Sequence, residues 1–121
     1  MKTNDLTGNE LCFAACMAEM PHLVWGKTIG MHEHSRQIIV PELREPFCYS
    51  PFINWGMCGP IIERELIAVV PISSPPPWAA TIQNKYGRKF PSGGPTPLIA
   101  AMRCYVASKL GDNIDIPEDL T

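Results

Sequence analysis

The clearest structural signal in the chain is the stretch from Thr96 to Gly111, which reads TPLIAAMRCYVASKLG. Thr96 suits the N-cap of a helix, and Pro97 suits the first helical position, where a missing N–H costs nothing. Gly111 is typical of a helix stop. The stretch therefore predicts an amphipathic helix over residues 97–110. Its apolar stripe is expected to consist of Leu98, Ile99, Met102, Tyr105, Val106 and Leu110.

A second helix is predicted near the N-terminus. Thr7 and Glu10 fit a capping box, and Leu6 and Leu11 fit the hydrophobic staple that accompanies it. The helix should end near Met20, because the proline that follows disfavours helical geometry in the preceding residue.

The rest of the chain predicts short strands and one short helix. A helix is expected over residues 60–65, with Pro60 at its first position. Runs rich in β-branched and aromatic residues predict four strands. They lie at residues 23–29, 36–40, 66–72 and 78–83, the third of them buried. The expected fold class is α+β, with a small, mostly antiparallel sheet of about four strands flanked by two amphipathic helices. We expect a single domain over residues 1–111 and an acidic C-terminal tail over residues 112–121.

The charge and hydropathy of the chain exclude several classes of protein. The formal net charge is −2, so the basic face of a general nucleic-acid binder is not expected. Four acids lie in the last ten residues, and the rest of the chain has ten basic and eight acidic residues, enough for one anionic ligand. No apolar run is long enough for a membrane span, and no signal peptide is indicated. We therefore expect a cytoplasmic protein.

The five cysteines do not form a recognisable metal or catalytic motif. Cys12 and Cys16 lie four residues apart and, with His22, could be metal ligands, but no fourth ligand has convincing zinc spacing. Cys58 beside a helix start could be a nucleophile with a lowered pKa, yet no histidine is placed by the sequence to act as its base. We expect no metal, no cofactor and no enzymatic activity.

The stretch from Tyr49 to Glu65 has the composition of a binding loop. Trp55 could stack on a ring while the Asn54 amide reads its edge; alternatively, the indole fills the core beneath a turn. Arg64 could grip a phosphate or carboxylate. In the alternative interpretation, Glu63-Arg64-Glu65 is a solvated helix end with local ion pairs.

The glycine-rich segment from Ser92 to Thr96 leads into the last helix. Backbone N–H groups at such a place can hold an anion, and Lys85 and Arg88 lie just upstream. The alternative is a flexible loop with ordinary helix capping.

Three segments together resemble the NinX-like proteins of tailed phages and prophages. They are Leu6-Thr7-Gly8, the run from Tyr49 through Trp55 to Gly59-Pro60-Ile61-Ile62-Glu63-Arg64-Glu65, and the run from Gly94 to Gly111. The family pattern has Asp-Trp-Ala-Gln-Gly-Gly-Pro in the central turn, so Trp55, Gly59 and Pro60 match, whereas Asn54 replaces an acid. The resemblance implies a small phage accessory protein in the cytoplasm of a bacterial host, without catalytic residues to transfer.

From these patterns we expect a counter-defence protein, acting as a homo-oligomer, that sequesters a nucleotide-derived signalling molecule. Alternatives are a module that inhibits a host or phage protein by docking, an enzyme that cleaves the same signals, and a role in phage recombination. The expected ligand-binding residues are Asn54, Trp55, Gly59, Arg64, Trp78, Lys85, Arg88, Ser92, Gly93, Gly94 and Thr96.

Overall fold

The computed structural model describes residues 1–27, 29–31, 38–39, 55–82, 89 and 91–118. The expected positions Asn54, Lys85 and Arg88 lie outside these residues. The described elements follow in the order η1 (Thr3–Asp5), α1 (Gly8–Glu19), β1 (Gly30–Met31), β2 (Ile38–Ile39), α2 (Trp55–Glu65), β3 (Ala68–Pro71), β4 (Trp78–Thr81), β5 (Ser92–Gly94) and α3 (Pro97–Leu110).

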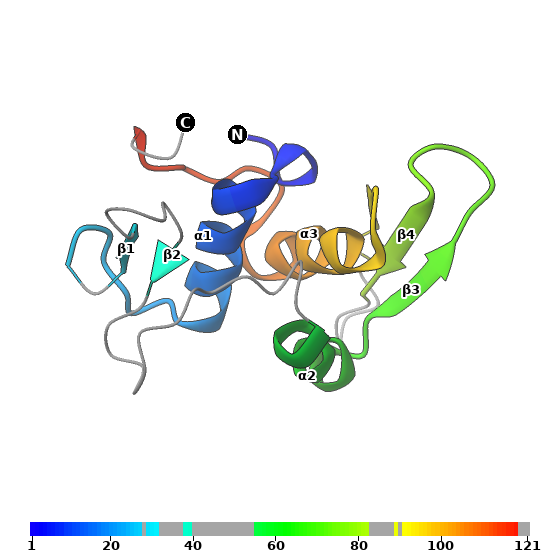
Figure 1. Cartoon of the computed structure of the whole chain (residues 1–121), viewed down its shortest axis with the longest axis horizontal. Coiled ribbons are helices and arrows are strands. Elements are labelled where there is room, and N and C mark those ends of the chain that lie inside the picture. Colours follow the sequence, from blue (N-terminus) through cyan, green and yellow to red (C-terminus); the bar gives the residue numbers. More distant parts are fainter. Residues whose placement is uncertain (28, 32–37, 40–54, 83–88, 90, 119–121) are drawn as a thin grey trace.

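Helix α3 lies at the centre of the molecule, between α1 and the sheet formed by β3, β4 and β5, and α2 runs below it (Figure 1). Its bounds agree with the prediction, and Thr96 caps it by accepting a 3.2 Å hydrogen bond from the Ile99 N–H. The buried surface extends beyond the expected stripe, because Ala100, Ala101 and Cys104 are also buried. These small side chains allow neighbouring elements to approach α3 from several sides.

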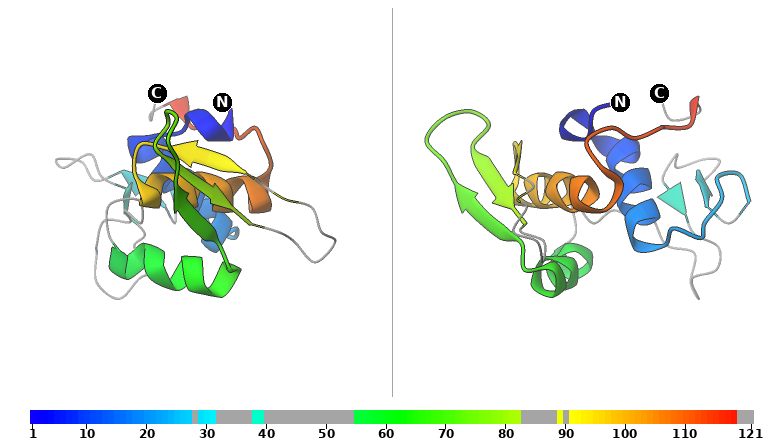
Figure 2. Two further views of the ribbon diagram at one scale, coloured as in Figure 1. Left: turned by 90° about the vertical axis from the view of Figure 1, so that its right-hand side faces the viewer. Right: turned by 180° about the vertical axis from the view of Figure 1, so that it is seen from behind.

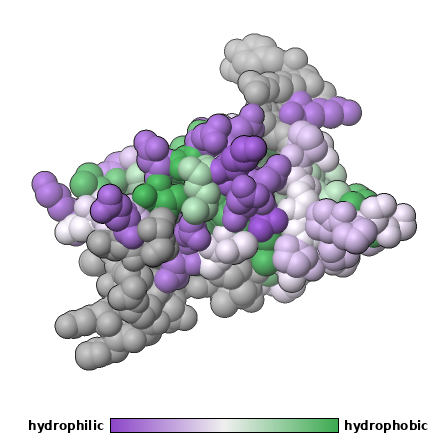
Figure 3. Space-filling view, turned by 90° about the horizontal axis from the view of Figure 1, so that it is seen from above, coloured by the Kyte–Doolittle hydropathy of each residue, from purple (hydrophilic) through white to green (hydrophobic). Residues whose placement is uncertain are grey.

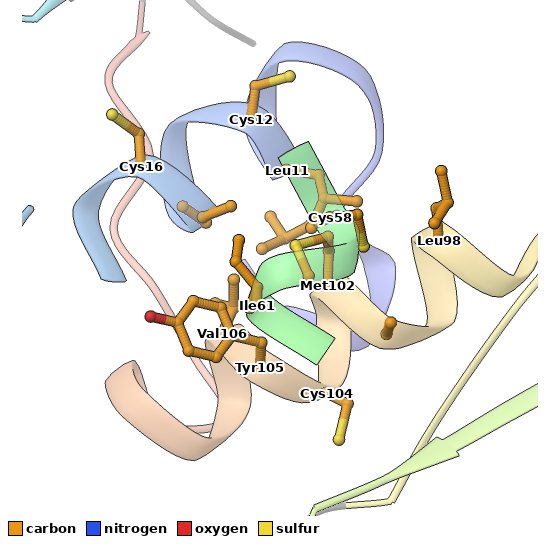
Figure 4. Packing of buried hydrophobic residues seen from close by; sticks show 14 of the residues in the cluster. Leu11, Cys12, Cys16, Cys58, Ile61, Leu98, Met102, Cys104, Tyr105 and Val106 are labelled. Atoms are coloured by element: carbon orange, nitrogen blue, oxygen red, sulfur yellow. The ribbon is translucent and has the colours of Figure 1, made fainter. Parts of the chain in front are cut away.

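The core lies where the three helices meet (Figure 4). Leu11 of α1, Cys58 and Ile61 of α2, and Met102 and Val106 of α3 are all at most 4% exposed. Cys58 and Ile61 are three residues apart and so share one face of α2.

The main sheet is antiparallel, with strand order β3-β4-β5. The α+β class is confirmed, but this sheet has three strands rather than about four. Ile38–Ile39, from the expected strand at 36–40, pairs with β1 in a separate two-stranded sheet. The expected strand at 23–29 is wrong, because Gly26 turns the chain with a φ of 83°. Among the described residues of this range, Trp25 and Ile29 form an isolated bridge rather than part of a strand.

The strand expected at 66–72 is present as β3, but the expectation that it is buried is wrong. Strand β3 covers only Ala68–Pro71 and lies at the edge of the sheet, with Ala68, Val70 and Pro71 exposed. An edge strand meets a neighbour on one side only, so apolar composition did not ensure burial here.

Helix α1 begins after Thr7, as expected, but the capping box does not form. Thr7 is the N-cap residue, yet its side chain accepts no capping hydrogen bond. Gly8 has a φ of 53°, outside the helical region, which disrupts the geometry that the box requires. Leu6 and Leu11 are nevertheless both fully buried.

The expected helix start at Pro60 is wrong, because α2 begins at Trp55 and contains Pro60. Proline cannot donate the N–H of a normal helical turn. Burial of Cys58 and Ile61 on either side of it compensates for that loss.

The two ends of the described chain pair with each other. The Met1 ammonium donates to the Ile114 carbonyl at 3.0 Å, and the Ile114 N–H donates to the Met1 carbonyl at 2.9 Å. The Thr3 N–H donates to the Asp112 carbonyl at 2.8 Å. The first residues of the acidic tail therefore form part of the folded body. None of the described helices combines the length and apolar character needed to cross a membrane.

Candidate functional site

Those expected ligand-binding residues that the structure describes do not converge on one place. Trp55 begins α2 and is 60% exposed. Trp78, in β4, is half-buried and packs against the core. Gly59 lies inside α2 rather than in a turn. The described positions thus separate into an α2 group and a second group on β4, β5 and the N-cap of α3.

Arg64 belongs to a polar cluster that joins the three helices. Its guanidinium forms an ion pair with Glu19 of α1 and donates to the Glu65 carboxylate at 2.9 Å. The Tyr105 hydroxyl donates to the same Glu19 carboxylate at 2.6 Å, and Lys109 lies 3.0 Å from Glu65. This arrangement agrees with the alternative interpretation, in which the end of α2 forms local ion pairs. Arg64 therefore already has acidic partners within the chain.

The cluster changes the pKa values of its members. Hydrogen bonds from Arg64 to Glu19 and Glu65 raise the pKa of the guanidinium. Burial raises the pKa of Tyr105, and its hydrogen bond to Glu19 raises it further. Burial alone would raise the pKa of Glu65, but hydrogen bonds from Arg64 and Lys109 outweigh it, so that pKa is lowered. All three shifts favour the protonation states found in the cluster at neutral pH.

Cys58 does not have the environment of an activated nucleophile. It is fully buried inside α2, and burial raises the pKa of its thiol to about 11. The lowered pKa expected from a helix-start position is therefore wrong. Among the described residues, no three histidine, cysteine or acidic side chains are grouped as metal ligands.

The first three residues of the glycine-rich segment form a strand rather than a loop. Ser92–Gly94 forms β5 and pairs with β4. A Cβ on Gly94 would lie 2.8 Å from the Ala100 nitrogen, and one on Gly93 would lie 2.7 Å from Pro76 Cγ. Both glycines are thus required by close packing, on opposite faces of the strand.

A hollow of about 390 Å³ lies beside β5, on the face that carries the chain ends. Hydrophilic residues gather on this face (Figure 3). We call the hollow the polar hollow; it is lined by Lys2, Thr3, Asn4, Lys89, Pro91, Ser92, Ala107, Asp112 and Asn113.

Ser92 is the expected residue that lines the polar hollow. It is 8% exposed, and within the described residues its buried Oγ has no hydrogen-bond partner. Buried hydroxyls are rarely left unpaired. Thr3, by contrast, donates from its hydroxyl to the Gly111 carbonyl at 2.6 Å.

Lys2, Asn4 and Asn113 were not identified from the sequence. They reach the hollow because Lys2 and Asn113 form a bridge between the two chain ends. No local motif signals that pairing, since the two residues are more than a hundred positions apart. In the sequence, only Lys85 and Arg88, upstream of Ser92, indicated a basic site in this region.

Arg103 fixes β5 at the edge of this region. Its Nε donates to the Leu6 carbonyl at 3.0 Å, and its Nη1 donates to the Gly93 carbonyl at 2.9 Å. Burial lowers the pKa of Arg103, and the charge of Asp5 opposes this shift. Arg103 thus connects the N-terminal segment, β5 and α3.

A family model described as "Bacteriophage P22, NinX" matches residues 2–109 of the chain. The match spans α1, the central segment and nearly all of α3. No curated protein matches the chain.

Proposed function

The chain belongs to the NinX family of bacteriophage P22, and on this premise we propose that it is a phage accessory protein that counters host defence. It does so by binding and sequestering a nucleotide-derived signalling molecule, without catalysis, in the cytoplasm of the bacterial host. We further propose that it acts as a homo-oligomer.

The observation that carries this proposal is the chemistry of the polar hollow. Its volume of about 390 Å³ lies within the usual range of small-molecule pockets, roughly 300–1,000 Å³. Lys2 and Lys89 supply exposed cations at its wall, and the unpaired Ser92 hydroxyl lies beneath it. Cations beside hydroxyl and amide groups suit a phosphate. We therefore propose that the phosphate end of the ligand binds in this hollow.

A thermal-shift panel of cyclic dinucleotides, cyclic oligonucleotides and ADP-ribose derivatives tests the proposal. A ligand at about a thousand times its Kd adds roughly 4 kcal/mol, which raises Tm by on the order of ten degrees in a domain of this size. We expect one selective shift, with the ligand recovered intact after denaturation. Recovery of a cleaved product would instead support an enzyme.

The site is tested with the double variant Lys2→Ala/Lys89→Ala. Each lost charge-assisted hydrogen bond costs about 1.5–3 kcal/mol, so affinity should fall at least tenfold. Lys27→Ala is the matched control, because Lys27 is also exposed but does not line the hollow. Unchanged affinity in the double variant would assign the ligand to another site.

A second function, inhibition of a protein by docking, is favoured by Trp55. The residue is 60% exposed at the start of α2, and tryptophan is enriched at interface hot spots. Under this proposal Trp55→Ala abolishes capture of a host or phage protein, but leaves nucleotide-induced thermal shifts unchanged. Loss of those shifts would instead place the ligand at α2.

Truncation of the acidic tail also distinguishes nucleotide binding from docking. A truncation should remove only residues 117–121, because residues 112–114 pair with the N-terminal segment. Nucleotide binding should survive this truncation. Docking should weaken if the acidic tail contributes to it by acting as a local mimic of nucleic acid.

A further inference from the structure

The lining of the polar hollow contains an acid as well as two cations. Lys2 and Lys89 are positively charged, and Asp112 is negatively charged. All three residues are exposed, and the other lining residues are uncharged. The hollow therefore presents a formal net charge of +1 to a ligand.

The backbone around Asp112 is fixed against the N-terminal segment. The Asp112 carbonyl accepts from the Thr3 N–H at 2.8 Å, and the Gly111 carbonyl accepts from the Thr3 hydroxyl at 2.6 Å. Lys2 forms its bridge with Asn113, the next residue along the chain. Both views in Figure 2 show the N-terminal segment, in blue, and the segment after α3, in orange to red, at the same end of the molecule. The acid and one cation are thus held at one wall of the hollow by the pairing of the chain ends.

A phosphate carries a different charge in a monoester and in a diester. A terminal monoester carries about −1.5 to −2 charges at pH 7, whereas each phosphodiester of a nucleic acid carries a single negative charge. The net charge of the hollow balances a single negative charge. The second charge of a monoester would share the hollow with Asp112, and the described lining residues include no third cation to offset it. A doubly charged group also costs more to remove from water.

We propose that the polar hollow selects a phosphodiester, as in a cyclic nucleotide, over a nucleotide that ends in a phosphate monoester. This inference rests on the proposed function, because it assigns the class of nucleotide that the hollow binds. Lys2 and Lys89 attract the phosphate, and Asp112 disfavours a second negative charge. The Ser92 hydroxyl, which is buried and has no partner among the described residues, donates to a phosphate oxygen.

The surroundings of Ser92 also suit a phosphate with two substituents. A second hollow, of about 440 Å³, shares Asn4, Pro91 and Ser92 with the polar hollow. The two hollows therefore adjoin at these residues. A phosphate beside the Ser92 hydroxyl can carry one ester group toward each hollow, whereas a terminal phosphate has only one ester group to place.

The test compares nucleotides that carry one phosphate each, as a diester or as a monoester. Cyclic AMP is paired with AMP, and cyclic GMP with GMP, and affinities for the full chain are measured by calorimetry at millimolar nucleotide and neutral pH. We expect the cyclic member of a pair to bind more tightly to the unchanged chain. In Asp112→Asn the monoester should gain more affinity than the diester, because it carries the additional charge. The affinity ratio should change by roughly fivefold, which is the effect of one unit charge about 4 Å away in water.

Asp115→Asn is the matched control. Asp115 is an exposed acid of the same segment, but it does not line the polar hollow, so its replacement should leave the affinity ratio unchanged. Asp112→Asn keeps the backbone carbonyl that pairs with Thr3, so the fold should be retained, and circular dichroism verifies this.

The inference would be overturned by a monoester that binds the unchanged chain as tightly as its cyclic partner, or by an affinity ratio that stays constant in Asp112→Asn. If both classes then weaken equally in Lys2→Ala/Lys89→Ala, the polar hollow remains the phosphate site and only the selectivity is wrong. Absence of binding by all four nucleotides would also overturn the inference. The proposed function depends instead on the panel of larger signalling molecules, so the two can fail separately.

Discussion

Leu66 provides a sharp test of the backbone conformation at the end of α2. We predict that Leu66→Gly stabilises the folded chain. The residue has a φ of 55°, and left-handed geometry costs a non-glycine residue roughly 1–2 kcal/mol. Because the side chain is 83% exposed, its removal sacrifices little packing. The greater freedom of glycine in the unfolded chain offsets part of the gain, which leaves about 1 kcal/mol.

The measurement is urea unfolding of the unchanged chain, Leu66→Gly and Leu66→Ala. Alanine keeps the strained geometry, so we expect its free energy of unfolding to remain within about 0.5 kcal/mol of the unchanged chain. Glycine should exceed alanine by about 1 kcal/mol. Runs at two protein concentrations separate this effect from any contribution of self-association.

Glu63 supplies the matched control for this pair. It is exposed within α2, where alanine should be more stable than glycine by about 1 kcal/mol. The order of the two substitutions should therefore reverse between positions 63 and 66. If alanine is the more stable residue at both positions, the left-handed conformation of Leu66 and the reasoning from it are refuted.

Three other predictions concern packing and pH. Gly94→Ala should destabilise the chain by about 1–3 kcal/mol in urea unfolding, because its Cβ would meet backbone atoms of α3; an unchanged midpoint would contradict this packing. The raised pKa of Tyr105 predicts stability that is fully present below pH about 10, the unfolded pKa, and lost as pH rises toward the folded pKa. Tyr105→Phe should flatten that alkaline fall, and an equally steep fall would refute the assignment. The lowered pKa of Glu65 predicts stability present above pH about 4.3 and lost as pH falls through the folded pKa; Glu65→Gln should reduce this acid dependence, as measured by Tm between pH 3 and 6.

The two main helices were predictable because their signals are local. Thr96, Pro97 and Gly111 fix both ends of α3 within a few residues, and the predicted bounds agree with the structure. The structure also has α1 starting after Thr7, although Gly8 prevents the side-chain cap that the pattern indicated.

Tertiary contacts explain what the sequence did not reveal. The apolar run at 66–72 resembles a buried strand, but only its pairing partners decide that β3 is an edge. The glycines of β5 suggested an anion-binding loop, whereas the approach of Ala100 and Pro76 requires them. Lys2 and Asn113 reach the polar hollow through pairing of the chain ends, for which no sequence pattern exists.

The pairing of the chain ends has a practical consequence for engineering. The Met1 ammonium donates to Ile114, so a purification tag fused ahead of Met1 would replace that donor beside the polar hollow. The same proximity makes the protein suited to circular permutation. A short linker could join residue 118 to Met1, with new ends opened between Ser74 and Pro75 in the exposed hairpin turn. Such a permutant would have no free termini beside the polar hollow. Purification tags could then be fused to the new ends in the hairpin turn, away from the hollow.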